Sequence, residues 1–214
     1  MRFKDLAVYL EKLEKTSSRN EITIILSELF KKADLSEIDK ITYLVLGQLA
    51  PRYKGIIFNL ADRMMMRILA KAYGADIEKV KVSYRQKGDL GGVAFSLAQN
   101  QKSKIKNQNL SVLDVHTRLL EVAKEVGEKS QERKINKTAE LLSNLDSLSA
   151  RFVTRIPLGR LRLGFSDKTI LDALSWMEMG NKSGRPLLTR VYEVLPDVGL
   201  LAKEVKEHGI EKAS

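Results

Sequence analysis

Apolar side chains recur at intervals of three and four residues along nearly the whole chain, which is the spacing of one face of an α-helix. Ile22, Ile25, Leu26, Leu29 and Phe30 give the clearest example. Alternating runs rich in Val, Ile and Thr, which are typical of strands, do not dominate anywhere in the sequence. The pattern therefore predicts an all-α protein of about twelve helices.

Start and stop signals place these helices along the chain. Ser18 and Glu21 have the spacing of a capping box, and Gly74 and Gly180 end apolar runs as helix C-caps do. Asp89 follows a glycine and predicts an N-cap. The Met64–Met66 run predicts core filling. The expected helices cover residues 6–13, 19–30, 36–50, 60–73, 77–85, 91–99, 112–126, 130–145, 149–156, 167–179, 186–194 and 196–208.

A faint internal repeat bears on how the helices are grouped. Residues 14–29 are echoed by residues 128–145. A duplication would give two pseudo-symmetric helical lobes, 1–100 and 110–208, that together form one domain. Chance similarity between two amphipathic helices explains the echo equally well.

Charge indicates the kind of partner. The chain has a formal net charge of +10 and a pI near 9.6, which favours a polyanionic ligand. We interpret the lysine-rich segment 100–109 as a solvated loop. Residues 147–166 contain no acidic residue, and apolar neighbours such as Phe152 and Ile156 would fix their backbone against a core, so this arginine-rich stretch predicts a binding surface.

The sequence lacks the groups that most enzyme mechanisms need. Cysteine is absent and the histidines are only His116 and His208, far apart, so we expect no metal site and no thiol nucleophile. Lys87-Gly88-Asp89-Leu90 approaches the K-x-D-G motif of nucleotidyl transfer, but its fourth position is Leu90 instead of glycine. No segment is apolar enough to span a bilayer. We expect a soluble cytoplasmic protein that is not an enzyme by itself.

Positive charge gathers instead at junctions where a loop enters a helix. The most informative junction runs from Gly159 to Gly164, where glycine permits close backbone approach and arginine offers a fork of donors to phosphate. Aromatic residues make up only 6% of the chain, which disfavours single-strand stacking and favours duplex recognition. The predicted DNA contacts are Gly159, Arg160, Leu161, Arg162, Gly164, Lys168, Ser18, Arg19, Ser130, Arg133, Lys134 and Lys137.

Several of these motifs, in their order and spacing, resemble the N-terminal DNA-binding domain of ATP-dependent DNA ligases of the archaeal and eukaryotic replicative type. The likeness covers essentially the whole chain. The motifs are Leu13-Glu14-Lys15-Thr16-Ser17-Ser18-Arg19, Leu46-Gly47-Gln48-Leu49-Ala50-Pro51, Gly88-Asp89-Leu90-Gly91, Gly159-Arg160-Leu161-Arg162-Leu163-Gly164 and Pro196-Asp197-Val198-Gly199.

The resemblance implies an all-α domain, residues 1–208, that grips nicked duplex DNA across the minor groove, with 209–214 beginning a linker. The intact ligase would seal breaks during replication and repair, using ATP and Mg²⁺. Its adenylated lysine would lie outside this chain, which would bind DNA without sealing it. The implied partners are nicked duplex DNA and the adenylation and OB-fold domains of the same ligase, with the protein acting as a monomer.

One loop departs from the family pattern. Gln101, Lys102 and Ser103 match a loop in which some archaeal ligases contact a sliding clamp through aromatic residues after the serine, but here Lys104 and Ile105 follow. We therefore expect this loop to touch DNA rather than a clamp. The alternative reading of the whole chain is a basic helical scaffold that docks acidic protein partners and has no preference for a nick.

Overall fold

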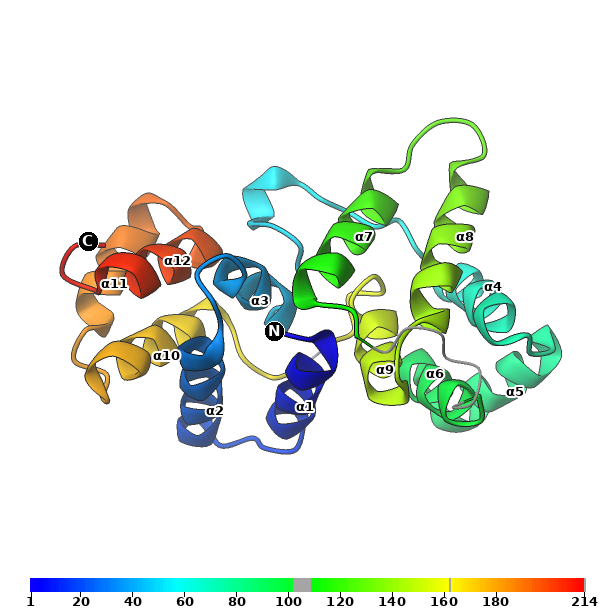
Figure 1. The fold of residues 1–214 in the computed structure, drawn as a ribbon, viewed down its shortest axis with the longest axis horizontal. Helices are drawn as coiled ribbons and strands as arrows, with labels where there is room; N and C mark the ends of the chain where they lie inside the picture. The colour runs from blue at the N-terminus through cyan, green and yellow to red at the C-terminus, as the bar shows by residue number, and fades with distance from the viewer. Residues whose placement is uncertain (102–108, 162, 214) are drawn as a thin grey trace. The chain divides into compact units, whose positions relative to one another are not determined.

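The computed structural model describes residues 1–101, 109–161 and 163–213, and all regular secondary structure within these ranges is helical (Figure 1). It comprises twelve α-helices and one short 3₁₀ helix, which confirms the all-α prediction for the part of the chain that is described.

The helices gather into two compact units, each built from segments far apart in the sequence. The described residues of unit 1 are Met1, Val8–Gly55 and 163–213, and those of unit 2 are Arg2–Ala7 and Ile56–Leu161 without 102–108. This division does not follow the two halves, 1–100 and 110–208, that the faint repeat suggested. The pseudo-symmetry of the repeat remains a prediction.

Unit 1 pairs helices from the two ends of the chain. In it α2 packs against α10, and α3 packs against α12. Leu26, Phe30, Ile41 and Leu44 are fully buried there, so the apolar faces that the sequence displays form its core. Besides most of α1 (Phe3–Glu14), the unit contains α2 (Arg19–Lys32), α3 (Ile38–Val45), the 3₁₀ helix η1 (Arg52–Lys54), α10 (Asp167–Met179), α11 (Arg185–Val194) and α12 (Val198–His208).

Unit 2 is formed by the middle of the chain and by the first turn of α1. Its closest helix pairs are α6 with α9 and α4 with α8. Phe3, Met65 and Phe152 are fully buried in its core. The unit contains α4 (Asp62–Tyr73), α5 (Ile77–Lys87), α6 (Leu90–Gln99), α7 (Val112–Lys124), α8 (Ser130–Ser143) and α9 (Ser147–Arg155).

Local capping follows the sequence in part. Asp89 accepts hydrogen bonds from the N–H groups of Gly91 and Gly92 at the start of α6, which confirms it as an N-cap. Ser18 accepts from the N–H of Glu21 as predicted, but the Glu21 carboxylate binds the hydroxyl of Thr16 rather than closing the box.

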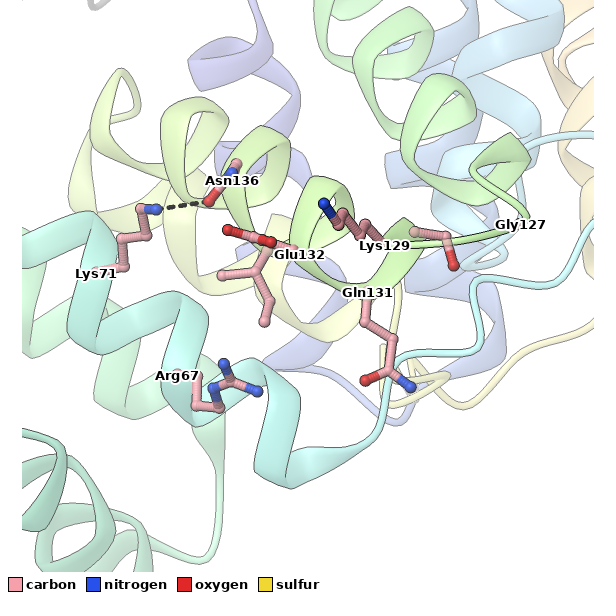
Figure 2. Close-up of a pocket in the computed structure, with 9 residues that line it drawn as sticks. Arg67, Lys71, Gly127, Lys129, Gln131, Glu132 and Asn136 are labelled. Carbon is pink, nitrogen blue, oxygen red and sulfur yellow. Dashed lines mark hydrogen bonds between the residues drawn. The ribbon is translucent and has the colours of Figure 1, made fainter.

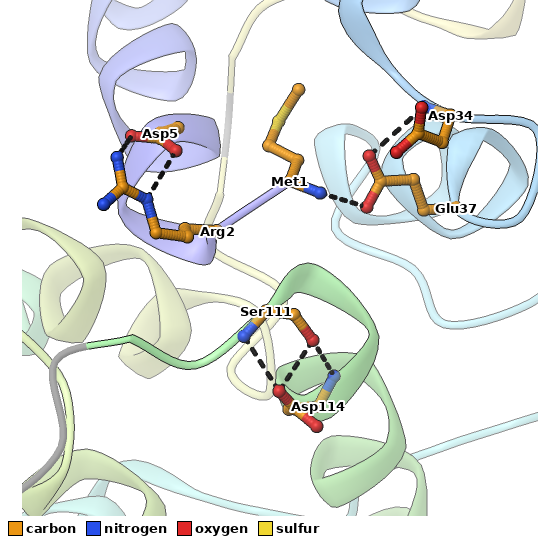
Figure 3. A network of polar contacts seen from close by, with 7 residues as sticks. All are labelled: Met1, Arg2, Asp5, Asp34, Glu37, Ser111 and Asp114. Carbon is orange, nitrogen blue, oxygen red and sulfur yellow. Dashed lines mark hydrogen bonds and ion pairs between the residues drawn. The ribbon is translucent and has the colours of Figure 1, made fainter.

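A complete capping box occurs at Ser111 and Asp114, where the sequence analysis found none. Figure 3 shows its reciprocal bonds in unit 2, with Ser111 N to Asp114 Oδ2 at 2.9 Å and Asp114 N to Ser111 Oγ at 3.1 Å. In unit 1 the same figure shows the Met1 amino group 2.6 Å from a carboxylate oxygen of Glu37. The capping box of Ser111 and Asp114 defines where α7 begins.

Three details of the predicted helices and core are wrong. The helix expected over 36–50 ends at Val45, because Gly47 adopts a left-handed φ of 70° and its N–H bonds back to the Leu44 carbonyl. Of the Met64–Met66 run only Met65 is fully buried. The core also extends past residue 208, since Ile210 is 1% exposed.

Candidate nucleic-acid interface

A basic hollow in unit 1 surrounds the first turn of α10. It has a volume of about 430 Å³ and brings together the predicted residues Arg19, Gly164 and Lys168. It also includes Arg185, which the sequence analysis did not single out. We call it the α10 hollow. Its remaining lining residues are Ile22, Phe165, Ser166, Thr169 and Asp172.

Backbone geometry suits this hollow to an anion. Gly164 has a φ of 78°, which favours glycine, and Ser166 precedes α10 without a side-chain cap bond. The first N–H groups of a helix have no partner within the helix, and the positive end of its dipole adds to their attraction for negative charge. Together with Arg19 and Lys168, these groups form a potential phosphate site.

Two carboxylates near this site are already engaged. Asp172 lies 3.1 Å from Arg185 Nε and 3.4 Å from Lys182 Nζ. The Tyr192 hydroxyl donates to Asp167 at 2.6 Å, and burial together with this carboxylate raises the pKa of Tyr192 to about 12. The negative charge of Asp172 is therefore balanced within unit 1, and the Asp167 carboxylate is hydrogen-bonded to a neutral hydroxyl.

A second basic hollow, the α8 hollow, surrounds the first turns of α8 in unit 2 and has a volume of about 610 Å³ (Figure 2). It contains the predicted Ser130, together with Arg67 and Lys71, which project from α4 and were missed. Lys71 Nζ lies 2.5 Å from Asn136 Oδ1. The other lining residues are Gly127, Lys129, Gln131, Glu132 and Ile135.

The other cations predicted on α8 are engaged inside unit 2. Lys134 is 5% exposed and its Nζ donates to the Phe58 carbonyl at 2.7 Å, so it stabilises packing and we leave it out of the candidate interface. Arg133 binds the Glu125 carboxylate and two loop carbonyls. Lys137 lies 2.7 Å from Glu125, and this hydrogen bond raises the pKa of Lys137. Arg133 and Lys137 thus hold the loop before α8.

The segment from Gly159 to Leu161 lies at the end of unit 2. Gly159 is exposed with a φ of 63°. Arg160 is 3.1 Å from the Tyr84 hydroxyl and 3.0 Å from Asp62, and these two contacts raise its pKa above the ordinary value. Leu161 is 5% exposed, so it belongs to the core rather than to a groove surface, contrary to the prediction. Arg162 lies outside the described residues.

An ion pair between α6 and α9 supports this segment. Arg155, at the end of α9, has its Nη2 2.6 Å from Asp89 Oδ2. Burial alone would raise the pKa of Asp89, but the Arg155 guanidinium and two backbone N–H groups outweigh it and hold the pKa below its usual value. A Cβ on Gly91 would lie 2.7 Å from Arg155 Nε, so only glycine permits this close helix pairing.

The side chains of Ser18 and Gln101, two other predicted contacts, each form a hydrogen bond within the protein. Ser18 is exposed, and its hydroxyl serves as the N-cap of α2. The Gln101 side chain donates to the Tyr73 carbonyl in unit 2. Lys102 and Ser103 lie outside the described residues.

The ranges that the structure covers contain no candidate metal site and no candidate membrane-spanning helix. No three His, Asp or Glu side chains there are grouped so that they could hold a metal ion. None of the helices described here has the length and apolarity needed to cross a membrane.

Comparison with known proteins shows the family to which this sequence belongs. The family described as DNA ligase N terminus matches residues 2–175. A protein named probable DNA ligase from Dictyoglomus turgidum is 38% identical over 99% of this chain, and DNA ligase 2 from Thermofilum pendens is 38% identical over 96% of it. A DNA ligase from Acidianus ambivalens is 36% identical over 99% of the chain.

The similarity runs along one part of these larger proteins. The chain covers 35% of the Dictyoglomus protein, 36% of the Thermofilum protein and 37% of the Acidianus protein. The family match spans residues from both units, including α2 and the first part of α10 in unit 1 and the whole of the described unit 2. This chain belongs to the DNA ligase N-terminal domain family.

Proposed function

We propose that this chain binds nicked duplex DNA as the DNA-binding domain of an ATP-dependent DNA ligase. The observation that carries the proposal is that each unit has a basic hollow at the start of a helix. Arg19 and Lys168 line the α10 hollow, and Arg67 and Lys71 line the α8 hollow. Cations beside helix N-termini suit the phosphate backbone of a duplex.

Recognition in this proposal depends on DNA shape and charge. Helix starts, glycines and arginines contact phosphates and the minor-groove edge, where the sequence code is degenerate. A nick makes a duplex easier to bend, and a protein that follows a bent backbone reads that deformability as binding energy. Gly159, Arg160 and Gly164 are the candidates for groove contact.

The chemistry of sealing would lie elsewhere in the intact ligase. We propose that its adenylation and OB-fold domains use ATP and Mg²⁺, while this chain acts as a monomer that holds the substrate. We also propose that the loop around Gln101, Lys102 and Ser103 contacts DNA rather than a sliding clamp. An assay of nick sealing with this chain alone is expected to show no product.

Fluorescence anisotropy with a labelled nicked duplex and an intact duplex of the same sequence tests the proposal. We expect tighter binding to the nicked duplex. If about six phosphates are neutralised, affinity should fall roughly 10³-fold between 50 and 200 mM salt, because binding releases condensed counterions. Equal and weak binding to both duplexes, with tight binding to acidic proteins, would instead support the interaction-scaffold alternative.

The α10 hollow can be tested with the double substitution Arg19→Ala and Lys168→Ala. Loss of two phosphate contacts should weaken binding to every duplex by on the order of tenfold and reduce the slope of log affinity against log salt by about 2. Both side chains are exposed, so the melting temperature should change little. Anisotropy over a salt series gives both values.

A matched control keeps the change in net charge but moves it away from both hollows. Lys31→Ala with Lys79→Ala removes two exposed lysines, one near the far end of α2 from Arg19 and one on α5. If this control weakens binding as much as the α10 double variant, only total charge matters and the α10 hollow is not a contact site.

A further inference from the structure

Unit 2 contains a further hollow, between α4 and α5, that the proposed DNA contacts leave largely unused. Its volume is about 960 Å³, near the upper end of the roughly 300–1,000 Å³ that ligand pockets occupy. We call it the α4–α5 groove. Only Arg67 is shared between it and the α8 hollow.

The floor of the groove is apolar. Met66 and Ala70 stand one turn apart on α4, and Ile77 opens α5 on the other side. All three remain partly exposed, because α4 turns its other face to the core and α5 buries only Val80. The floor is therefore an apolar surface without a covering element among the described residues.

The rim of the groove is cationic. Arg63 and Arg67 come from α4, and Arg85 comes from the last turn of α5. All three are exposed, and among the described residues none of these guanidinium groups forms an ion pair. Lys81, the fourth cation of the groove, lies 2.6 Å from Glu78. The Tyr84 hydroxyl is fixed at one end by its bonds to Asp62 and Arg160.

We propose that the α4–α5 groove binds an acidic amphipathic helix of a partner protein. Apolar side chains of that helix would cover Met66, Ala70 and Ile77, and its carboxylates would pair with the rim arginines. Charge complementarity identifies the partner as acidic. A phosphodiester backbone would satisfy the arginines but would leave the apolar floor uncovered, so the floor favours protein over DNA. This function goes beyond DNA binding.

The shared arginine gives the proposal a consequence for DNA binding. Arg67 lines both the α4–α5 groove and the α8 hollow, so a helix that engages it in the groove removes a cation from the proposed DNA contact. Partner and DNA are therefore expected to compete in part.

The test uses the full chain and a fluorescein-labelled helical peptide with leucines at positions i, i+3, i+4 and i+7 and glutamates elsewhere. Anisotropy should report binding in the micromolar range, and a version with serines in place of leucines should bind at least tenfold more weakly.

Variants of the groove test the same contacts from the protein side. Arg63→Ala with Arg85→Ala, and separately Met66→Ser, should each weaken binding of the leucine peptide about tenfold. Lys31→Ala with Lys79→Ala is the control of equal charge.

Three results would overturn the proposal. They are failure of the leucine peptide to bind, equal binding of the serine peptide, and a loss of nicked-duplex affinity in the Arg63 and Arg85 variant as large as its loss of peptide affinity. The last result would make the groove a DNA contact. Melting temperatures identify any variant that fails to fold. The nick preference of the unaltered chain is measured separately, so the DNA proposal can fail or survive by itself.

Discussion

Replacing Asp89 with alanine is expected to lower the free energy of unfolding by about 4 kcal/mol. The Asp89 carboxylate pairs with Arg155 and caps α6 through Gly91 and Gly92. The side chains of Arg155 and Asp89 are 10% and 30% exposed, so the substitution removes a carboxylate that pairs with a largely buried guanidinium charge, which costs about 3 kcal/mol, and losing the cap costs about 1 kcal/mol more. Urea denaturation followed by circular dichroism measures the change.

Asp89→Asn separates the two contributions. Asparagine keeps an oxygen that can cap α6 but has no charge, so this variant should be less destabilised than the alanine variant by about 1 kcal/mol. If both variants unfold at the same urea concentration as the unaltered chain, the pair does not stabilise unit 2.

Acid provides a second check on the same pair. The folded-state pKa of Asp89 is depressed, so its contribution is fully present above the unfolded-state pKa, about 3.9, and is lost as pH falls through the folded-state value. The difference in stability between the unaltered chain and Asp89→Asn should therefore be constant near neutral pH and shrink in acid. A difference that grew in acid would contradict the assigned cause.

Gly199→Ala is expected to destabilise unit 1 by at least the upper end of the roughly 1–3 kcal/mol that overpacking costs. A Cβ at this position would lie 2.2 Å from Cζ of Tyr43, so α12 could not keep its distance from α3. The shift would also disturb Asp197, which accepts hydrogen bonds from the hydroxyls of Tyr43 at 2.6 Å and Tyr53 at 3.0 Å. Thermal unfolding of the variant measures the loss.

Two comparisons test the steric cause. In a Tyr43→Leu background the ring that blocks the new methyl group is gone, so Gly199→Ala should cost much less there, and the two changes should be strongly non-additive. Gly92→Ala is the matched glycine control, because its new Cβ would approach no atom closer than the Asp89 carboxylate, at 3.3 Å. An equal loss of stability from both glycine variants would mean that backbone freedom, and not the Tyr43 contact, sets the effect.

Much of the fold follows from local sequence. The period of the apolar residues predicts the helices, and Asp89, Gly74 and Gly180 mark boundaries where the structure has them. These signals act within one or two helical turns, so they can be read without knowing the tertiary structure. The helix expected over 36–50 shows the limit, because Gly47 ends it early while the apolar period continues through Leu49.

The candidate site is predicted only in part. Arg19 is well over a hundred residues from Gly164 and Lys168 in the sequence. Basic loop-to-helix junctions predicted all three as DNA contacts, but only the α10 hollow shows that they lie together. The sequence around Arg67, Lys71 and Arg185 gives no sign of a binding site, because exposed cations are common on helices. Only the tertiary structure shows that they line a hollow at the start of a helix. Lys134 is the opposite case. The sequence predicted it as a DNA contact, but its ammonium group is buried and donates to the Phe58 carbonyl.

By itself the sequence determined the helical class, most helix boundaries, the basic character of the chain and its resemblance to ligase DNA-binding domains, because periodicity, capping and charge are properties of neighbouring residues. The tertiary structure alone decided how the helices divide into units and which cations remain available. Both depend on contacts between residues distant in the sequence, such as α2 with α10 and Arg155 with Asp89. Burial and ion pairing then separate Lys134, which is engaged in packing, from Arg19 and Lys168, which line an open hollow.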